Sequence, residues 1–132
     1  MIHPHEITIG SLLRTNKGEI IRVESISTKH GHRKVGYHRP NEPCRIKYVR
    51  LTQCEGIELT PETLEKNGFE KHGYWVKYID DIEIDICLSN DIPMYYYGKP
   101  WNYCFPHPTY VHELQRALRC AGLHELANGI KI

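Results

Sequence analysis

The sequence predicts an α+β fold in which a small SH3-like β subregion is followed by an antiparallel sheet packed by a C-terminal helix. Short alternating runs of apolar and polar residues fill residues 1–54, as in small curled sheets. Strand and hairpin patterns return over residues 69–105, and residues 110–121 repeat apolar positions with a helical period. A chain of 132 residues is expected to form a single domain, 1–132. Its two parts are a basic β-rich subregion, 1–54, and a part with a helix, antiparallel hairpins and the C-terminal helix, 55–132.

The front part is predicted to consist of short strands separated by turns. Glu19–Ile26 forms one predicted strand after a turn at Asn16–Gly18. Arg33–Tyr37 and Arg45–Leu51 are further predicted strands, and Pro40–Pro43 forms the turn between them. No helical pattern interrupts these runs, which favours a curled sheet or an SH3-like barrel.

The clearest local signal is a short helix in the middle of the chain. Thr60 is its predicted N-cap, Pro61 occupies the first helical position, and Asn67-Gly68 ends it. Phe69–Tyr78 follows as a predicted hairpin that turns at His72-Gly73. The helix therefore separates the basic β-rich part from a second sheet.

A strictly alternating strand is predicted at Asp81–Leu88, with its apolar residues facing inward and its acids facing outward. Met94–Tyr97 and Trp101–Phe105 are predicted to form another hairpin, because they flank a Gly-Lys-Pro turn. The outward acids of the alternating strand are Asp81, Glu83 and Asp85.

The last regular element is a predicted helix from Tyr110 to about Ala121, with Thr109 as its N-cap. His112 is expected on its polar face. The tail Ile130–Ile132 is predicted to form an edge strand. Across the back part, the predicted core comprises Leu64, Phe69, Trp75, Ile82, Ile84, Ile86, Leu114 and Leu118.

The charge of the chain is strongly polarised. Residues 1–54 hold ten Lys or Arg and four Asp or Glu, a net +6, whereas residues 55–132 hold seven and twelve, a net −5. The segment 29–50 is the most basic, and such a segment is typical of contact with an anionic partner, either nucleic acid or an acidic protein surface. An alternative is attraction to the acidic half of the same chain or of a second copy in a homo-oligomer. The predicted contact residues are Arg33, Lys34, Tyr37, Arg39, Arg45 and Lys47.

Aromatic residues are concentrated in the predicted hairpin 94–105. Such a group either completes the core through cross-strand pairs or forms a protein-binding surface. Tyr96 and Trp101 are the contact residues predicted for the second case. This gives an alternative function, a protein–protein adaptor or an oligomeric structural protein.

Five stretches of the chain carry a family resemblance. They are Gly10–Leu13, Glu19–Ile26, Leu59–Leu64, Gly68–Lys71 and Tyr110–Gln115. In order and spacing they resemble a family of small uncharacterised proteins encoded in phages, prophages and mobile elements of gut-associated bacteria. The family has no assigned activity, so the resemblance implies an accessory protein of phage or mobile-element origin and carries over no catalytic residue.

Several kinds of site and location are not expected. The N-terminus lacks a signal-peptide pattern, and no run approaches the roughly 18 apolar residues of a membrane span, so a cytoplasmic protein without a membrane partner is expected. The five cysteines are odd in number and include no C-x-x-C pair, which favours reduced thiols. No phosphate-binding glycine loop or nucleophile motif is present, so no cofactor and no catalytic residue are predicted.

Two metal-site hypotheses remain as alternatives. The outward acids of strand 81–88 could hold Mg²⁺ in a metal-dependent hydrolase, although the alternation itself explains them as the solvated face of the strand. Cys104, His107 and His112 are residue types suited to Zn²⁺, but the sequence shows no obvious fourth ligand. The main prediction is therefore a non-catalytic binding protein that contacts an anionic partner through residues 29–50.

Overall fold

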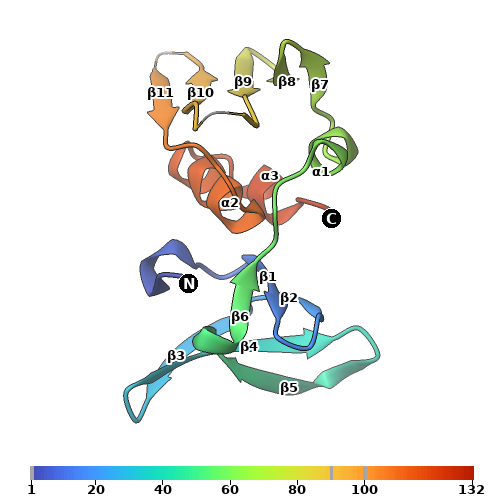
Figure 1. Cartoon of the computed structure of the whole chain (residues 1–132), viewed down its shortest axis with the longest axis vertical. Coiled ribbons are helices and arrows are strands. Elements are labelled where there is room, and N and C mark those ends of the chain that lie inside the picture. The colour runs from blue at the N-terminus through green and yellow to red at the C-terminus, as the bar shows by residue number, and fades with distance from the viewer. Residues whose placement is uncertain (1, 90, 100) are drawn as a thin grey trace.

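The computed structural model describes residues 2–89, 91–99 and 101–132, and it shows an α+β fold of antiparallel strands with a few short helices (Figure 1). The helices are α1 (Pro61–Lys66), α2 (Val111–Cys120) and α3 (His124–Asn128), with 3-10 turns η1 (Pro4–Glu6) and η2 (Leu51–Gln53). The strands are β1 (Leu12–Thr15), β2 (Ile20–Arg22), β3 (Ser25–Lys29), β4 (His32–Arg39), β5 (Glu42–Arg50), β6 (Cys54–Gly56), β7 (Glu70–His72), β8 (Tyr74–Ile79), β9 (Ile82–Ile86), β10 (Met94–Tyr97) and β11 (Asn102–Phe105).

The front part contains two three-stranded sheets, ordered β2-β1-β6 and β3-β4-β5. They share a buried cluster made of Ile2, Ile7, Leu13, Ile21, Val23, Val35, Tyr37, Leu51 and Cys54. The prediction of one strand over 19–26 is wrong, because β2 and β3 belong to different sheets. The Val23 amide donates to the Ser11 carbonyl at 2.8 Å, and the Glu24 amide donates to the Gly36 carbonyl at 2.8 Å. The amides of the adjacent residues Val23 and Glu24 thus bond to different sheets, and the alternation of apolar and polar residues does not reveal this.

The back part is built on a five-stranded sheet, ordered β11-β10-β9-β8-β7. Thr60 caps α1 as predicted, and its Oγ1 accepts a hydrogen bond from the Thr63 amide at 3.2 Å. The predicted hairpins are also confirmed, with β7 pairing with β8 and β10 pairing with β11. A second buried cluster includes Leu64, Phe69, Ile84, Ile86, Leu114 and Leu118, and Trp75 and Ile82 are partly buried against it.

Three predictions about the C-terminal region are wrong. The N-cap of α2 is Tyr110 rather than Thr109, because the Glu113 carboxylate accepts hydrogen bonds from both amides, at 2.9 Å from Tyr110 and 3.1 Å from Thr109. His112 is buried, with 1% of its surface exposed. The tail 130–132 forms no strand; its Lys131 backbone is instead bonded to the Asn67 side chain, and α3 precedes it.

One buried side chain connects the front part to the C-terminal helices. The Gln115 Oε1 atom accepts a hydrogen bond from the Leu12 amide at 2.9 Å. Its Nε2 atom donates to the Gly10 carbonyl at 2.9 Å and to the Ala127 carbonyl at 3.0 Å. Gln115 is fully buried, so these bonds satisfy its amide and hold α2 against β1 and α3.

Candidate functional site

The strands that hold the predicted basic contact residues form the sheet β3-β4-β5, whose two faces differ. Cross-strand partners lie on the same face, and Val35 pairs with Val49 on the face that packs against the buried cluster of the front part. Tyr37 lies on that face too, with 6% of its surface exposed. Its prediction as a contact residue is therefore wrong. In Figure 1, β1, β2 and β6 lie on one side of this sheet.

The opposite face of the same sheet is exposed. It carries two further cross-strand pairs, Lys34 with Arg50 and Gly36 with Tyr48. Tyr48 is 58% exposed, and Ile46, two residues away on β5, is also largely exposed. We call the residues Lys34, Ile46, Tyr48 and Arg50 the basic face.

Gly36 sets the position of the Tyr48 ring. A Cβ atom at Gly36 would overlap the Ser25 hydroxyl and would lie 3.1 Å from Cε1 of Tyr48. Because position 36 has no side chain, the ring can lie against the β4 backbone with its other side toward solvent. The basic face thus presents one flat aromatic surface beside two cations.

The other basic residues predicted as contacts do not form one continuous surface with the basic face. Arg39 is bound to Glu19, with Nε and Oε1 3.1 Å apart, and the hydrogen bond raises the pKa of Arg39. Lys47 lies on the core-facing side opposite Tyr37 and is 3.6 Å from a Glu42 oxygen. Arg33 and Arg45 are exposed, and within the described chain neither has an ion-pair partner. The sequence segment is basic, but its charges divide between two faces and the ends of the strands.

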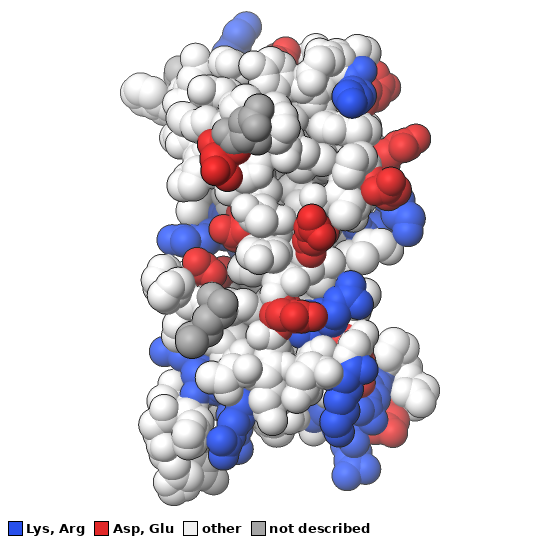
Figure 2. Space-filling model, viewed as in Figure 1, with Lys and Arg blue, Asp and Glu red and all other residues white. Residues whose placement is uncertain are grey.

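The charge polarity of the sequence is visible on the surface. Figure 2 shows mainly Lys and Arg over the lower third of the molecule, where Figure 1 places the sheet β3-β4-β5. Asp and Glu are more frequent over the upper two thirds of this view. Ile46, Tyr48 and Arg50 lie within the predicted basic segment 29–50, where Tyr48 and Tyr37 are the interleaved tyrosines, but none of the three is among the six predicted contact residues. Their spacing of two along β5 was the available signal, because it places them on one face.

The two aromatic residues predicted for protein contact have opposite environments. Tyr96 is buried on the inner face of the five-stranded sheet, with its ring centroid 5.3 Å from that of Tyr103. Its prediction as a surface contact is wrong, because it completes the core. Trp101 is 66% exposed and remains available to a partner.

The structure does not assemble the predicted zinc ligands. Cys104 is exposed on β11, the Nδ1 atom of His107 donates to the Ile92 carbonyl at 3.0 Å, and His112 is buried beside Tyr110. Across residues 2–89, 91–99 and 101–132, no group of three His, Cys, Asp or Glu side chains is arranged to hold a metal ion. Asp81, Glu83 and Asp85 are likewise not part of such a group among the described residues.

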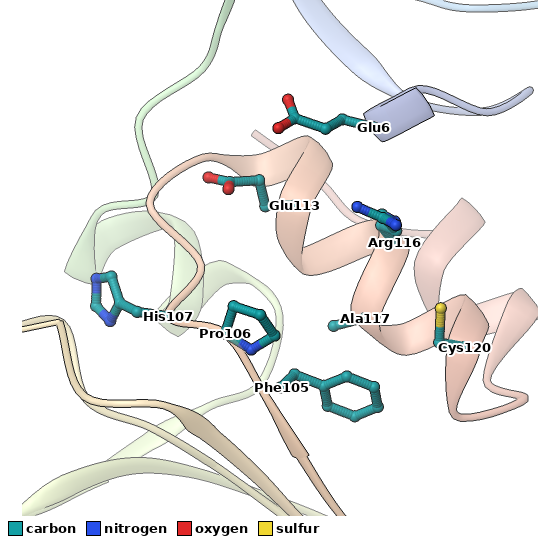
Figure 3. A pocket seen from close by; sticks show the side chains of 8 residues that line it. All are labelled: Glu6, Phe105, Pro106, His107, Glu113, Arg116, Ala117 and Cys120. Atoms are coloured by element: carbon teal, nitrogen blue, oxygen red, sulfur yellow. The ribbon is translucent and has the colours of Figure 1, made fainter. Parts of the chain in front are cut away.

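A cleft of about 190 Å³ lies between β11, η1 and α2 (Figure 3). Figure 3 shows His107 and Cys120 at opposite ends of this cleft, with Glu113 near the start of α2. Glu113 already accepts hydrogen bonds from the backbone at the helix N-terminus. Because its polar groups are separated or already bonded, the cleft offers no nucleophile–base pair.

A second cleft, of about 350 Å³, lies where η1, β6 and α2 meet. It is lined in part by His112, whose Nε2 atom is 3.5 Å from a Glu6 oxygen. Burial lowers the pKa of His112, and the nearby carboxylates of Glu6 and Glu113 oppose this shift. Burial also raises the pKa of Cys54 to about 11, which keeps the thiol protonated and unreactive. Both ring nitrogens of His112 are shielded from solvent, and neither has a hydrogen-bond partner in the described structure.

The comparisons with known proteins do not extend this description. No protein-family model, curated protein or solved structure matches the chain. The phage-associated family therefore stays a prediction from the sequence. Among the helices that the structure describes, none has the length and apolar character needed to cross a bilayer.

Proposed function

We propose that this protein binds single-stranded nucleic acid on the basic face of the sheet β3-β4-β5. The observation that carries the proposal is the exposed Tyr48 ring, which lies against Gly36 and next to the Lys34–Arg50 pair. An exposed aromatic ring offers a stacking surface to any base, and adjacent cations attract the phosphates. A flat strand face with these two features suits unpaired bases better than the edges of a duplex.

Several finer features belong to the same proposal. The strands β1–β6 form an SH3-like subregion, supported by two small antiparallel sheets around one apolar cluster. The protein is a non-catalytic accessory protein of phage or mobile-element origin, which rests on the sequence resemblance alone. The contact residues are now Lys34, Tyr48 and Arg50, with the exposed Arg33 and Arg45 as neighbours that add positive charge.

The test is binding of labelled single- and double-stranded oligonucleotides at about 50 and 200 mM salt. Tyr48→Ala should weaken single-strand binding by about tenfold, because one base loses its stacking partner. Lys34→Ala with Arg50→Ala should lower the slope of log affinity against log salt by about 1.4, as expected for two lost phosphate contacts on a single strand. The matched charge control is Lys66→Ala with Lys131→Ala.

Three results would contradict the proposal. The first is no binding of either oligonucleotide at about 50 mM salt. The second is equal weakening by the control pair, which would indicate general attraction to a charged chain. The third is unchanged affinity in Tyr48→Ala, which would remove the stacking role.

A protein adaptor is the second candidate function, favoured by the exposure of Trp101. An exposed tryptophan is the residue type most often found at the energetic centre of a protein interface. In that case Trp101→Ala should abolish partner binding with little dependence on salt, and Tyr48→Ala should leave it unchanged.

A further inference from the structure

The five-stranded sheet has an outer face that differs from its core-facing side. Ile84 and its cross-strand partner Tyr96 belong to the buried cluster, so the residues on either side of Ile84 in β9 point away from it. These residues are Glu83 and Asp85. We call the acidic face the set Tyr74, Tyr78, Glu83, Asp85, Tyr95 and Tyr97.

The strand register places Glu83 between two tyrosines and Asp85 between a tyrosine and Val76. Glu83 pairs directly with Tyr97 on β10 and with Tyr78 on β8. Asp85 pairs directly with Tyr95 on β10. Neighbouring strands lie about 4.8 Å apart, so Tyr78 and Tyr97 lie on strands about 10 Å apart, on either side of Glu83. A cation that contacts Glu83 from outside the sheet would therefore lie beside a tyrosine ring.

These rings are not explained by packing alone. They help to bury Val76, which faces the same side of the sheet from β8. However, Tyr78 is 67% exposed, and Tyr74 and Tyr97 are exposed as well. Large exposed rings gathered on one face are typical of an interaction surface.

The charge of this face has one sign. The outer positions of its strands hold Glu70, Glu83 and Asp85 and, among the described residues, no Lys or Arg. The Oδ1 atom of Asp85 is shielded from solvent and has no hydrogen-bond partner in the described structure. Burial first, and then Glu83, raises the pKa of Asp85 to about 6. A cation placed above the pair would relieve the repulsion between the two carboxylates.

We infer that the acidic face binds an arginine-bearing segment of a partner protein, with a guanidinium above Glu83 and Asp85 and between the tyrosine rings. A guanidinium is planar, stacks on aromatic rings and donates two parallel hydrogen bonds to a carboxylate, whereas an ammonium acts as a point charge. An open strand surface fits an extended protein segment, and none of the residues of this face lines the clefts described above. This site is separate from the basic face and does not depend on it.

The experiment measures binding of a labelled oligoarginine peptide by fluorescence anisotropy, with oligolysine and oligoglutamate peptides of the same length for comparison. We expect oligoarginine to bind most tightly and oligoglutamate not to bind. Glu83→Gln with Asp85→Asn should weaken oligoarginine binding at least about tenfold, because the charged partners are removed. The matched control is Glu62→Gln with Glu65→Gln, two exposed acids on α1.

A second pair of variants tests the rings without altering the charge. Tyr78→Ala should weaken oligoarginine binding several-fold, and Tyr78→Phe should retain it, because the ring supplies the contact. Tyr78 is largely exposed, so both variants are expected to fold, and circular dichroism checks this. Equal affinity in Tyr78→Ala and Tyr78→Phe would overturn the stacking arrangement.

Binding should also be weaker at about pH 5 than at about pH 7.5, because Asp85 is then largely protonated. The titratable groups on the same face of its own and the other strands of the sheet are Glu70, His72, Tyr74, Tyr78, Glu83, Tyr95, Tyr97 and Cys104, and His72 is bonded to Glu70. The inference is overturned if the control variant, Glu62→Gln with Glu65→Gln, weakens oligoarginine binding as much as Glu83→Gln with Asp85→Asn does. It is also overturned if oligoarginine fails to bind while the chain self-associates in sedimentation and the E83Q/D85N variant does not, because a second copy would then be the occupant.

Discussion

The outer face of the five-stranded sheet and that of the sheet β3-β4-β5 are built in the same way and carry opposite charge. Each presents exposed tyrosine on a strand surface whose other face packs into an apolar cluster. In the sheet β3-β4-β5 the tyrosine lies beside Lys34 and Arg50, and in the five-stranded sheet the tyrosines flank Glu83 and Asp85. The overall charge of +1 is the sum of +6 over residues 1–54 and −5 over residues 55–132, and it describes neither part.

The comparison shows where partner choice resides in this molecule. Aromatic rings give both faces contact area, whereas the charge between the rings decides whether a phosphate or a guanidinium is attracted. A partner should therefore be sought separately for each face. The largest change in stability is expected where Gln115 connects the front part to the C-terminal helices, and the smallest from the titration of single groups.

The largest effect is expected at Gln115, which joins the two regions. Gln115→Leu removes three hydrogen bonds and leaves the Leu12 amide and the Ala127 carbonyl without partners, whereas the Gly10 carbonyl keeps its bond from the Arg22 guanidinium. The free energy of unfolding should fall by about 2–4 kcal/mol. Urea denaturation measures this, with Gln53→Leu as the exposed control. A loss as small as that of the control would mean that Gln115 does not hold the regions together.

The second prediction separates the two faces by their ligands. Lys34→Glu with Arg50→Glu should weaken oligonucleotide binding by more than about tenfold and leave oligoarginine binding unchanged. Glu83→Gln with Asp85→Asn should do the reverse. Anisotropy titrations of both variants with both ligands form the test. If either variant loses both ligands, the faces are not independent, and the comparison fails.

The third prediction concerns Gly36, which has no counterpart on the acidic face. Gly36→Ala should cost about 1 kcal/mol of stability, because the new Cβ overlaps the Ser25 hydroxyl and presses on the Tyr48 ring. Ser25→Ala in the same chain should recover most of this loss. Thermal unfolding of the single and double variants gives the measurement. Failure of Ser25→Ala to restore stability would show that the ring, rather than the hydroxyl, is the obstacle.

The smallest effect is a pair of titrations with opposite signs, one at His112 on α2 and one at Asp85 on β9. The pKa of His112 is lowered below its ordinary 6.5, so the unfolded chain binds the proton first and stability falls as pH falls through about 6.5. The pKa of Asp85 is raised from 3.8 to about 6, so the folded chain holds the proton longer and stability falls as pH rises through that interval.

Stability measured from about pH 4.5 to 7.5 should separate these contributions. His112→Leu should remove the loss on the acid side, and Asp85→Asn should remove the loss on the alkaline side. A flat difference between Asp85→Asn and the unmodified chain across this range would mean that Asp85 is not perturbed in the folded state.

Local signals predicted much of the secondary structure. The Thr60 cap, the turn at His72-Gly73 and the alternating strand around Ile84 were all read correctly, because each depends on neighbours in sequence. The wrong predictions share a cause. The strand 19–26 and the edge strand at 130–132 satisfied the local pattern, but the partners of their backbone groups lie far along the chain.

The candidate sites divide in the same way. The sequence shows where basic and aromatic residues are concentrated, in the segment 29–50 and the hairpin 94–105. It does not show that Tyr37 and Tyr96 are core residues. Burial depends on which face of a strand meets the rest of the protein, and a strand with polar and aromatic residues on both faces does not specify this by its pattern.

The sequence by itself determined the charge polarity, the alternation of strands and the positions of caps and turns, because these follow from residue type and short-range geometry. Only the tertiary structure decided that His112 and Gln115 are buried, that Tyr48 rather than Tyr37 is exposed, and that Glu83 lies between tyrosines from two other strands. The physical reason is that these properties arise from pairing between residues distant in sequence. Such pairing is selected by the burial of the whole chain and not by any one segment.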